Sequence, residues 1–228
     1  MTDLESSDNL IQRFQGVRSE VDALAKQQHQ AVSLLAVSKK HPAHSIETLY
    51  NQGQNCFAEN YVQEGVDKVN ELRHLQIEWH FIGPIQSNKT RLVAESFSWV
   101  HTIDRDKIAQ RLNDQRPENL APLNVLIQVN ISDQDSKSGI HLGELASLAD
   151  FIQQQPKLKL RGLMCIPAPL NDTELKQEFL AMHKAYEDLK AKYDTVDTLS
   201  MGMSGDLELA IACGSNMVRI GTAIFGQR

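Results

Sequence analysis

The segment LLAVSKKHP, residues 34–42, is a short apolar run that ends in a serine, two lysines, a histidine and a proline. A continuous apolar run of this length is typical of a buried strand. Lys39 follows the run directly, although lysine is among the residues least often buried. The strand therefore either reaches water at Lys39 or places an amine at the mouth of a site.

Further apolar segments share the features of this one. They are rich in β-branched or aromatic residues and stop at Gly, Asn, Asp or Pro. The predicted strands are residues 33–38, 56–59, 78–83, 99–103, 124–130, 159–166, 197–202 and 216–221. Helical periodicity between them predicts helices at 43–52, 60–75, 88–96, 104–113, 142–155, 174–193 and 205–213. Ser87 and Asp104 are the predicted N-caps of the third and fourth of these helices.

The alternation of strands and helices predicts an α/β fold. Repeated βα units form parallel sheets, and eight such units close into a single TIM-type (β/α)8 barrel. A helix is expected within residues 1–30, where it can cover the place of the missing eighth helix. No Pro-, Gly- or Ser-rich linker divides the sequence, so we expect one domain over residues 1–228. An open, doubly wound sheet is the alternative fold, because periodicity alone does not show closure.

The composition argues against several classes of protein. The chain has 228 residues and a net charge of −6, with no basic stripe to neutralise the phosphates of a nucleic acid. No signal-peptide core and no apolar window of membrane-spanning length occurs, so we expect a cytoplasmic protein. Its three cysteines lie far apart and form no disulfide framework, so we expect free thiols in a reducing compartment. No unpaired apolar face is evident, and we expect a monomer.

The carboxyl ends of barrel strands carry the chemistry of this fold. No paired carboxylates of the glycosidase kind occur at these ends. No carboxylate–histidine cluster is expected around the imidazoles there, so we predict no metal site. Read in chain order, the strand ends are polar and carry few acids: Lys39, Asn60, His80, His101, Asn130, Met164–Cys165, Ser200 and Arg219.

Arg219 is expected to face the mouth of the barrel. Within MVRIG, residues 217–221, alternation puts Val218 and Ile220 on one side of the strand and Arg219 on the other. Its partner is either a neighbouring carboxylate or a bound ligand.

The loops after the last two predicted strands have the features of a phosphate site. SMGMSGD (200–206) opens a helix near Ser204, and RIGTAIFG (219–226) puts Gly221 and Thr222 directly after the last strand. Barrels often bind phosphate at these two positions through backbone N–H groups, and glycine allows close approach of the backbone.

Lys39 and these loops together indicate a ligand that carries both a phosphate and a group that reacts with an amine. Partial burial lowers the pKa of a lysine, which favours the unprotonated amine that attacks an aldehyde. Pyridoxal 5'-phosphate (PLP) has both groups. Two alternatives stay open: a solvated lysine at a strand end, and an aldolase with a lysine Schiff base, which would give Arg219 no role.

Eight motifs spread over almost the whole chain point to one family: LLAVSK (34–39), FAENYVQE (57–64), WHFIGPIQSNK (79–89), NVLIQVNIS (124–132), SKSGI (136–140), RGLMCIP (161–167), DTLSMGMSGDLELAI (197–211) and GSNMVRIGTAIFG (214–226). With these motifs the chain resembles the pyridoxal-phosphate homeostasis protein family, which is similar to the N-terminal barrel of alanine racemase. Two positions depart from the family pattern: Ala58 replaces a usual glycine, and Gly205 replaces a common acidic residue.

The resemblance implies a fold-type III PLP-binding barrel in which Lys39 holds PLP as a Schiff base. The implied phosphate neighbours are Ser200, Ser204, Gly221 and Thr222; Asn60 is implied beside the ring, His80 as a further neighbour, and Arg219 at the pyridine nitrogen. A guanidinium only donates hydrogen bonds, so the ring nitrogen that faces it stays unprotonated, which weakens the ring as an electron sink.

Two functions of different class follow from the resemblance. The first is a non-catalytic carrier in intracellular vitamin B6 and amino-acid homeostasis, which would donate PLP to apo PLP-dependent enzymes. The second is a PLP-dependent amino-acid racemase, which needs a second acid/base opposite the lysine. Alanine racemases supply that group from a separate C-terminal domain, whereas here Tyr61 is the residue that could be nominated. We favour the carrier. Lys137, in the loop 132–140, could receive the aldehyde during transfer, or it is simply a solvated lysine.

Overall fold

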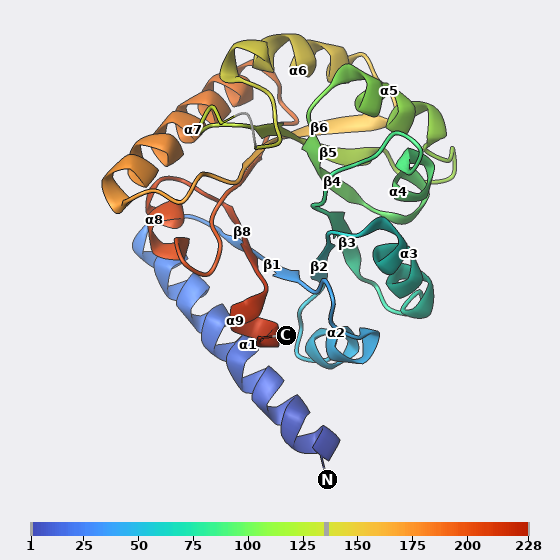
Figure 1. Cartoon of the computed structure of the whole chain (residues 1–228), viewed down its shortest axis with the longest axis vertical. Coiled ribbons are helices and arrows are strands. Elements are labelled where there is room, and N and C mark those ends of the chain that lie inside the picture. Colours follow the sequence, from blue (N-terminus) through green and yellow to red (C-terminus); the bar gives the residue numbers. More distant parts are fainter. Residues whose placement is uncertain (1, 135–136, 228) are drawn as a thin grey trace.

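The computed structural model describes residues 2–134 and 137–227, which form a closed barrel of parallel strands (Figure 1). Each strand pairs with the next along the chain, and β8 pairs with β1 from Ser33↔Met217 to Ala36↔Ile220. This closure confirms the predicted TIM-type barrel and excludes the open sheet. The strands are β1 (Ser33–Val37), β2 (Cys56–Glu59), β3 (Glu78–Phe81), β4 (Trp99–Ile103), β5 (Leu123–Val129), β6 (Leu158–Cys165), β7 (Thr198–Ser200) and β8 (Met217–Ile220).

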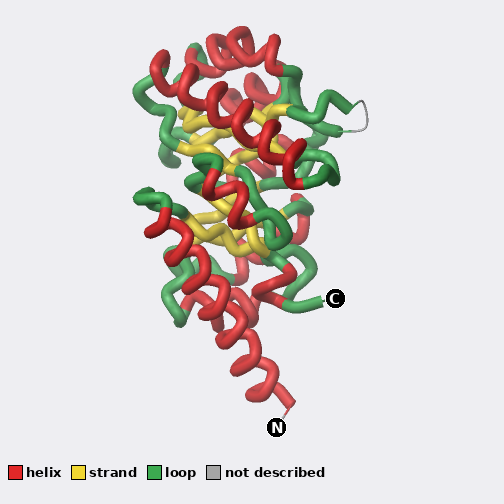
Figure 2. The backbone as a smooth tube through the Cα atoms, turned by 90° about the vertical axis from the view of Figure 1, so that its left-hand side faces the viewer, coloured by secondary structure: helices red, strands yellow, loops and turns green. Residues whose placement is uncertain are grey.

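Helices enclose the barrel on the outside, as the second view shows (Figure 2). In the described part of the chain, none of them is both long and apolar enough to span a membrane. They are α1 (Thr2–Gln27), α2 (Ala43–Tyr50), α3 (Val62–Glu71), α4 (Thr90–Ser96), α5 (Asp106–Gln115), the 3₁₀ helix η1 (Leu142–Glu144), α6 (Leu145–Gln153), α7 (Asp172–Lys192), α8 (Leu207–Ala212) and α9 (Thr222–Phe225).

The two predicted N-caps are wrong. Lys89 and Arg105 precede the first turns of α4 and α5 instead. The backbone carbonyl of Ser87 accepts hydrogen bonds from two side chains, and the carboxylate of Asp104 pairs with Arg105 at 2.9 Å. Both residues therefore act in the loops that precede these helices.

Helix α1 covers the place that a full-length helix after β8 would take, as predicted. In the described residues only the short helix α9 follows β8. Helix α1 runs along the outside of the barrel against α8, α9 and α2 (Figure 1). Nε of Arg13 donates a hydrogen bond of 2.8 Å to the carbonyl of Ile224, which ties α1 to the short helix α9. The buried stripe of α1 recurs every three or four residues and consists of Leu10, Phe14, Val17 and Val21.

Strand side chains alternate between two cores, because successive residues of a strand point to opposite faces. Outward-facing residues such as Phe57 and Trp79 join the large cluster that the helices cover. Inward-facing residues form two smaller clusters, Leu35, Val37, Ala58 and Met217 in one and Trp99, Leu126 and Met164 in the other. Polar side chains share this interior, and they position the sites described below.

Candidate functional site

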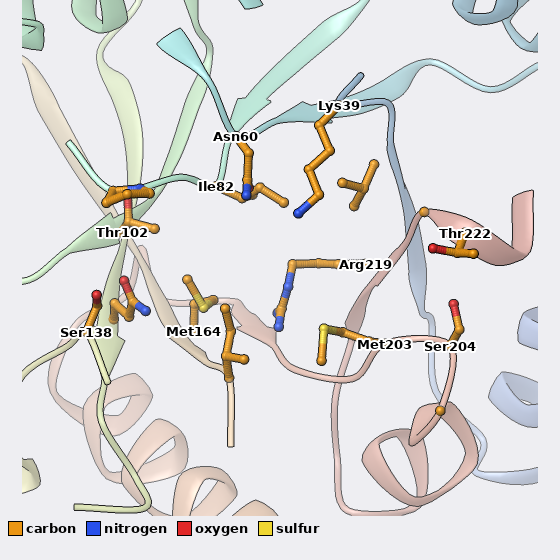
Figure 3. A pocket seen from close by; sticks show the side chains of 16 residues that line it. Lys39, Asn60, Ile82, Thr102, Ser138, Met164, Met203, Ser204, Arg219 and Thr222 are labelled. Atoms are coloured by element: carbon orange, nitrogen blue, oxygen red, sulfur yellow. The ribbon is translucent and has the colours of Figure 1, made fainter. Parts of the chain in front are cut away.

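A cavity of about 440 Å³ opens at the carboxyl ends of the strands (Figure 3). Figure 3 shows Asn60 beside Lys39, the side chain of Arg219 below them, and Ser204 close to Thr222 at one side of the cavity. The structure thus brings together six of the residues that the sequence nominated: Lys39, Asn60, Ser204, Arg219, Gly221 and Thr222.

A buried polar network holds the backbone just before Lys39. The hydroxyl of Ser38 donates a hydrogen bond of 2.6 Å to Oε1 of Glu59, whose side chain is fully buried. Nζ of Lys68 donates to the same oxygen at 2.7 Å and to the backbone carbonyl of Ser38 at 2.9 Å. Because the carbonyl of Ser38 is fixed in this way, the direction in which Lys39 leaves the strand is fixed as well.

The backbone just after Lys39 is held by the same network. Lys40 adopts a left-handed backbone conformation with φ of 64°, which is uncommon for a residue other than glycine. Its N–H donates to the carboxylate of Glu64. That carboxylate also pairs with Nζ of Lys68 at 2.7 Å. Sequence reasoning missed this support, although the i, i+4 spacing of Glu64 and Lys68 on one helix was a signal for it.

Asn60 is positioned by a close backbone contact. A Cβ atom added to Gly83 would lie 2.0 Å from the carbonyl oxygen of Asn60, so only glycine allows this approach. The hydroxyl of Thr102 donates a hydrogen bond of 2.7 Å to the carbonyl of Gly83 and holds the loop in place. The strand end that carries Asn60 is therefore packed tightly against the loop after β3.

Arg219 is buried in the floor of the cavity and is held by neutral partners. Its Nη1 donates to the hydroxyl of Ser200 at 2.8 Å, and its Nη2 donates to the backbone carbonyl of Cys165 at 2.9 Å. Burial lowers the pKa of the guanidinium, but arginine stays protonated in proteins. Neither partner is a carboxylate. Ser200 is fully buried and does not line the cavity.

Two loops meet at the side of the cavity that carries Ser204 and Thr222. Gly202 has φ of 98°, and a Cβ there would lie 2.6 Å from Cβ of Ala210, so this turn requires glycine. Ser204 follows in the same loop, while Gly221 and Thr222 come directly after β8. Hydroxyl and backbone N–H groups from two loops can converge here on one anion.

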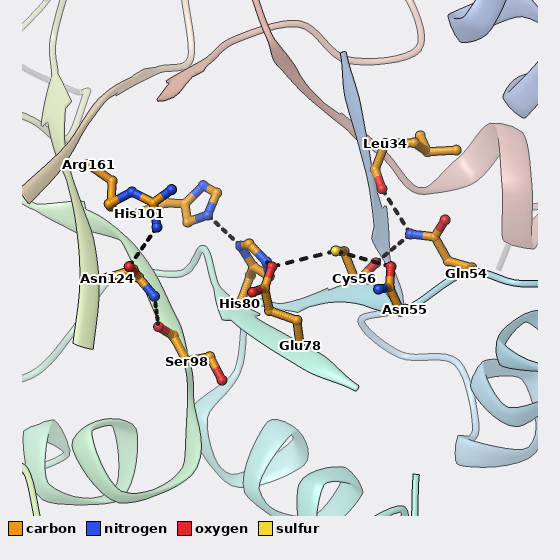
Figure 4. A network of polar contacts seen from close by, with 10 residues as sticks. All are labelled: Leu34, Gln54, Asn55, Cys56, Glu78, His80, Ser98, His101, Asn124 and Arg161. Carbon is orange, nitrogen blue, oxygen red and sulfur yellow. Dashed lines mark hydrogen bonds and ion pairs between the residues drawn. The ribbon is translucent and has the colours of Figure 1, made fainter. Parts of the chain in front are cut away.

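His80 lies inside the barrel and does not line the cavity. Its strand ends at Phe81, and the next inward-facing residue, Ile82, lines the cavity instead. Nδ1 of His80 is 2.9 Å from Nε2 of His101, and Nε2 of His80 donates to Oε1 of Glu78 at 3.0 Å (Figure 4). The expected absence of a carboxylate–histidine cluster is therefore wrong.

Charge within this cluster follows from burial. Burial lowers the pKa of His80 and lowers that of His101 well below its ordinary value, so both rings are neutral at neutral pH. The hydrogen bond from His80 lowers the pKa of Glu78 to about 2, so this side chain is a carboxylate.

The loop after β5 brings Lys137 towards the loop after β6. Nζ of Lys137 donates a hydrogen bond of 3.2 Å to the carbonyl of Pro167, and Ser138 lines the cavity. Residues 135 and 136 of this loop lie outside the described residues. Asn130 was placed at the rim by the sequence. Its amide binds the carbonyl of Gln134 at 2.8 Å instead of lining the cavity.

Several lining residues were not nominated from the sequence. They include Ile82, Thr102 and Gln128. Gln128 carried a usable signal, because it is an amide that interrupts the apolar run 125–129 of strand β5. Thr102 carried none, since the register between β4 and β5 shifts at this point.

Comparison with known proteins supplies a family. The model for the N-terminal domain of alanine racemase matches residues 15–228. A pyridoxal phosphate homeostasis protein from Pasteurella multocida is 55% identical over an alignment of 225 residues, and the match covers 96% of this chain and 96% of that one. PipY from Synechococcus elongatus, solved with PLP bound, is 33% identical with a TM-score of 0.80 and covers 95% of this chain and 100% of its own.

An alanine racemase from Corynebacterium glutamicum shares the fold. Its TM-score is 0.70 at 17% identity, and the match covers 91% of this chain and 62% of that one. At this identity the likeness concerns the architecture of the barrel.

Proposed function

The chain belongs to the pyridoxal phosphate homeostasis protein family, and on this basis we propose that it binds PLP in the 440 Å³ cavity, covalently through Lys39. The observation that carries the proposal is that one cavity holds the amine of Lys39 at the end of β1 and the hydroxyls of Ser204 and Thr222 in the loops after β7 and β8. The cavity volume lies within the range of about 300–1,000 Å³ that is usual for small-molecule sites.

Each functional group of PLP has a candidate partner in the cavity. Nζ of Lys39 would attack the aldehyde carbon, form a C=N bond and release one water molecule. The hydroxyls of Ser204 and Thr222 and the backbone at Gly221 would bind the phosphate. Asn60 would lie beside the ring. Ser200 would act through Arg219, because the hydroxyl of Ser200 accepts a hydrogen bond from the guanidinium of Arg219.

Arg219 favours retention of PLP over catalysis. Its side chain is buried and already donates to two protein oxygens, so its orientation is fixed before PLP binds. A guanidinium offers the pyridine nitrogen only a donor. The nitrogen would therefore stay unprotonated, and the ring would stabilise negative charge poorly. This supports the proposal that the protein carries PLP within vitamin B6 homeostasis.

The racemase alternative needs an acid/base on the ring face opposite Lys39. Tyr61 was the nominated residue. It is 48% exposed and does not line the cavity, and Nζ of Lys40 lies 5.7 Å from the centre of its ring. Tyr61 is thus an exposed partner of a lysine, which favours the carrier over the racemase.

We further propose that the carrier acts in the cytoplasm as a monomer and hands PLP to apo PLP-dependent enzymes. Cys56, Cys165 and Cys213 are free thiols, which agrees with a reducing compartment. Lys137 is the proposed receiver of the aldehyde during transfer, since its loop borders the cavity at Ser138. Unchanged transfer by Lys137→Ala would exclude that step.

The test compares PLP with pyridoxal, which lacks the phosphate, by visible absorption during titration. We expect PLP to bind at least tenfold more tightly, and the double variant Ser204→Ala/Thr222→Val to lose that preference. Thr48→Val is the matched control, because its hydroxyl bonds to the carbonyl of His44 in α2, away from the cavity. Equal affinity for the two ligands in the unmodified protein would refute the assignment of the phosphate site.

A second measurement separates carrier from racemase. The PLP-loaded protein is incubated with an apo PLP-dependent enzyme, whose regained activity reports transfer, and separately with L-alanine, followed by chiral chromatography. We expect transfer without formation of D-alanine. Sustained racemisation at the rate of a true racemase would overturn the carrier assignment.

A further inference from the structure

Three side chains of metal-binding type converge at the opposite end of the barrel, where the strands begin (Figure 4). Cys56 begins β2 and Glu78 begins β3, and the two residues are register partners. His80 lies two residues beyond Glu78, on the same face of the strand. Two adjacent strands therefore direct a thiol, a carboxylate and an imidazole to one point.

The distances between the ligand atoms suit a small divalent ion. Sγ of Cys56 lies 3.6 Å from Oε1 of Glu78, and Nε2 of His80 lies 3.0 Å from the same oxygen. All three atoms lie within 4.8 Å of one another. Zinc bond lengths of about 2.0–2.3 Å at tetrahedral angles require neighbouring ligands to be about 3.3–3.6 Å apart. The first two distances differ from that range by a few tenths of an ångström at most, and the third, between Sγ of Cys56 and Nε2 of His80, is no longer than 4.8 Å.

A hollow of about 380 Å³ gives access to this point. Cys56 and Glu78 both line it, together with Arg161 and Asp197. The side chain of Glu78 is 45% exposed, whereas His80 is fully buried. An ion would therefore enter from the hollow, and its fourth coordination position would face the hollow and hold water.

The surroundings of His80 match those of a metal-bound histidine. Such a ring usually donates its second N–H to a neighbouring acceptor. Nδ1 of His80 is 2.9 Å from Nε2 of His101. Nδ1 of His101 is buried and makes no hydrogen bond within residues 2–134 and 137–227.

Metal binding rearranges protons in a balanced way. Without metal, Nε2–H of His80 donates to Glu78, so Nε2–H of His101 donates to Nδ1 of His80. With metal on Nε2 of His80, the proton of His80 lies on Nδ1 and is donated to Nε2 of His101. The proton of His101 then lies on its own Nδ1. Each ring keeps one proton, and the thiol proton of Cys56 is the one released.

The local charge balance also suits a divalent cation. The thiolate and the carboxylate together supply two negative charges. Arg161, a cation that lines the same hollow, is already paired with Asp197 at 2.5 Å, bonded to Asn124 at 2.8 Å and stacked on the ring of Trp99. The carboxylate of Asp197 therefore balances the charge of Arg161 within the hollow.

We propose that Cys56, Glu78 and His80 form a binding site for a divalent transition metal, with Zn²⁺ as the ion that best suits one sulfur, one nitrogen and one oxygen ligand. The site joins β2 to β3 at the amino-terminal face of the barrel, where interactions serve stability rather than chemistry. It is separate from the PLP cavity and does not depend on the function proposed above.

The test uses Co²⁺ as a spectroscopic probe of the metal-free protein under reducing conditions. We expect one equivalent of Co²⁺ to give tetrahedral d–d bands and a near-ultraviolet sulfur-to-cobalt band, and Zn²⁺ to abolish both. Cys56→Ser should lose the sulfur band, and Glu78→Gln should bind at least tenfold more weakly. Cys213→Ser, which removes a buried thiol on another element, and Lys39→Ala should both bind as the unmodified protein does.

A second readout guards against a variant that simply misfolds. Zn²⁺ should raise the melting temperature of the unmodified protein and of Cys213→Ser, but not that of Cys56→Ser. Absence of the sulfur band in the unmodified protein, or its retention in Cys56→Ser, would overturn the proposal.

Discussion

Lys68→Met tests the polar network that supports Lys39. The substitution keeps the apolar part of the side chain and removes Nζ, which bonds to Ser38, Glu59 and Glu64 at 2.7–2.9 Å. Glu59 would remain fully buried with the hydroxyl of Ser38 as its partner, because its second oxygen has no hydrogen bond within the described residues. Removing one partner of a buried ion pair costs about 3–5 kcal/mol.

The effect on melting temperature follows from that free energy. For a domain of this size, 1 kcal/mol corresponds to about 2–4 °C, so we expect the melting temperature at pH 8 to fall by roughly 6–20 °C. Urea denaturation followed by circular dichroism would give the free energy of unfolding directly. Lys184→Met is the matched control, because Lys184 also pairs with an acid four residues away, but both side chains are about 70% exposed or more. That control should change stability by less than about 0.5 kcal/mol.

The loss of stability in Lys68→Met should change with pH in a direction that follows from the pKa of Glu59. Burial raises the pKa of Glu59 in the folded protein, and Lys68 opposes this rise. Without Lys68 the pKa rises further, so folded protein binds a proton that unfolded protein releases. The deficit of Lys68→Met should therefore be largest at pH 8 and shrink as the pH falls towards 5.

The double variant Lys68→Met/Glu59→Gln removes the buried charge and should recover part of the lost stability at pH 8. A loss for Lys68→Met no larger than that of Lys184→Met would refute this reasoning. A deficit that grows as the pH falls would refute it as well.

Three further substitutions test the packing of the site, an open position on α1 and the cap of α7. Gly83→Ala should destabilise the protein by about 1–3 kcal/mol in thermal or urea unfolding and weaken PLP binding, because its Cβ would meet the carbonyl of Asn60 at 2.0 Å. Gly16→Ala, in open space on α1, should instead stabilise it by about 0.5–1 kcal/mol, and a similar loss in both variants would contradict this account. Asn171→Ala should lower the unfolding free energy by about 1 kcal/mol, since the Asn171 side chain accepts two backbone N–H groups at the start of α7; no change in urea unfolding would mean that this cap contributes nothing.

Long-range architecture was predictable here because it rests on repeated, strong signals. Each strand is a short segment with apolar residues that the fold buries, and βα repetition leaves few topologies once eight strands are recognised. The helix caps failed because Ser87 and Asp104 are favourable only locally. The backbone carbonyl of Ser87 accepts a hydrogen bond from Arg111 of α5, which is distant in the chain, and the carboxylate of Asp104 pairs with the neighbouring Arg105.

A residue at the end of a strand could be predicted only where the position of that strand's end could be predicted. Lys39 and Arg219 follow directly from strand position and alternation, and both line the cavity. His80 was placed at the rim although it stands in the middle of the predicted strand 78–83. The next inward-facing residue, Ile82, lines the cavity, so His80 lies one layer deeper, among Glu78 and His101. Such partners depend on how neighbouring strands are staggered, which the sequence does not state.

Identification of the lysine that carries PLP tests the central claim most directly. The PLP-loaded protein is reduced with borohydride, digested and analysed by mass spectrometry. We expect one pyridoxyl group per chain on Lys39, none on the adjacent Lys40 or on Lys137, and no stable label in Lys39→Ala. A label on another lysine, or undiminished labelling of Lys39→Ala, would contradict the account.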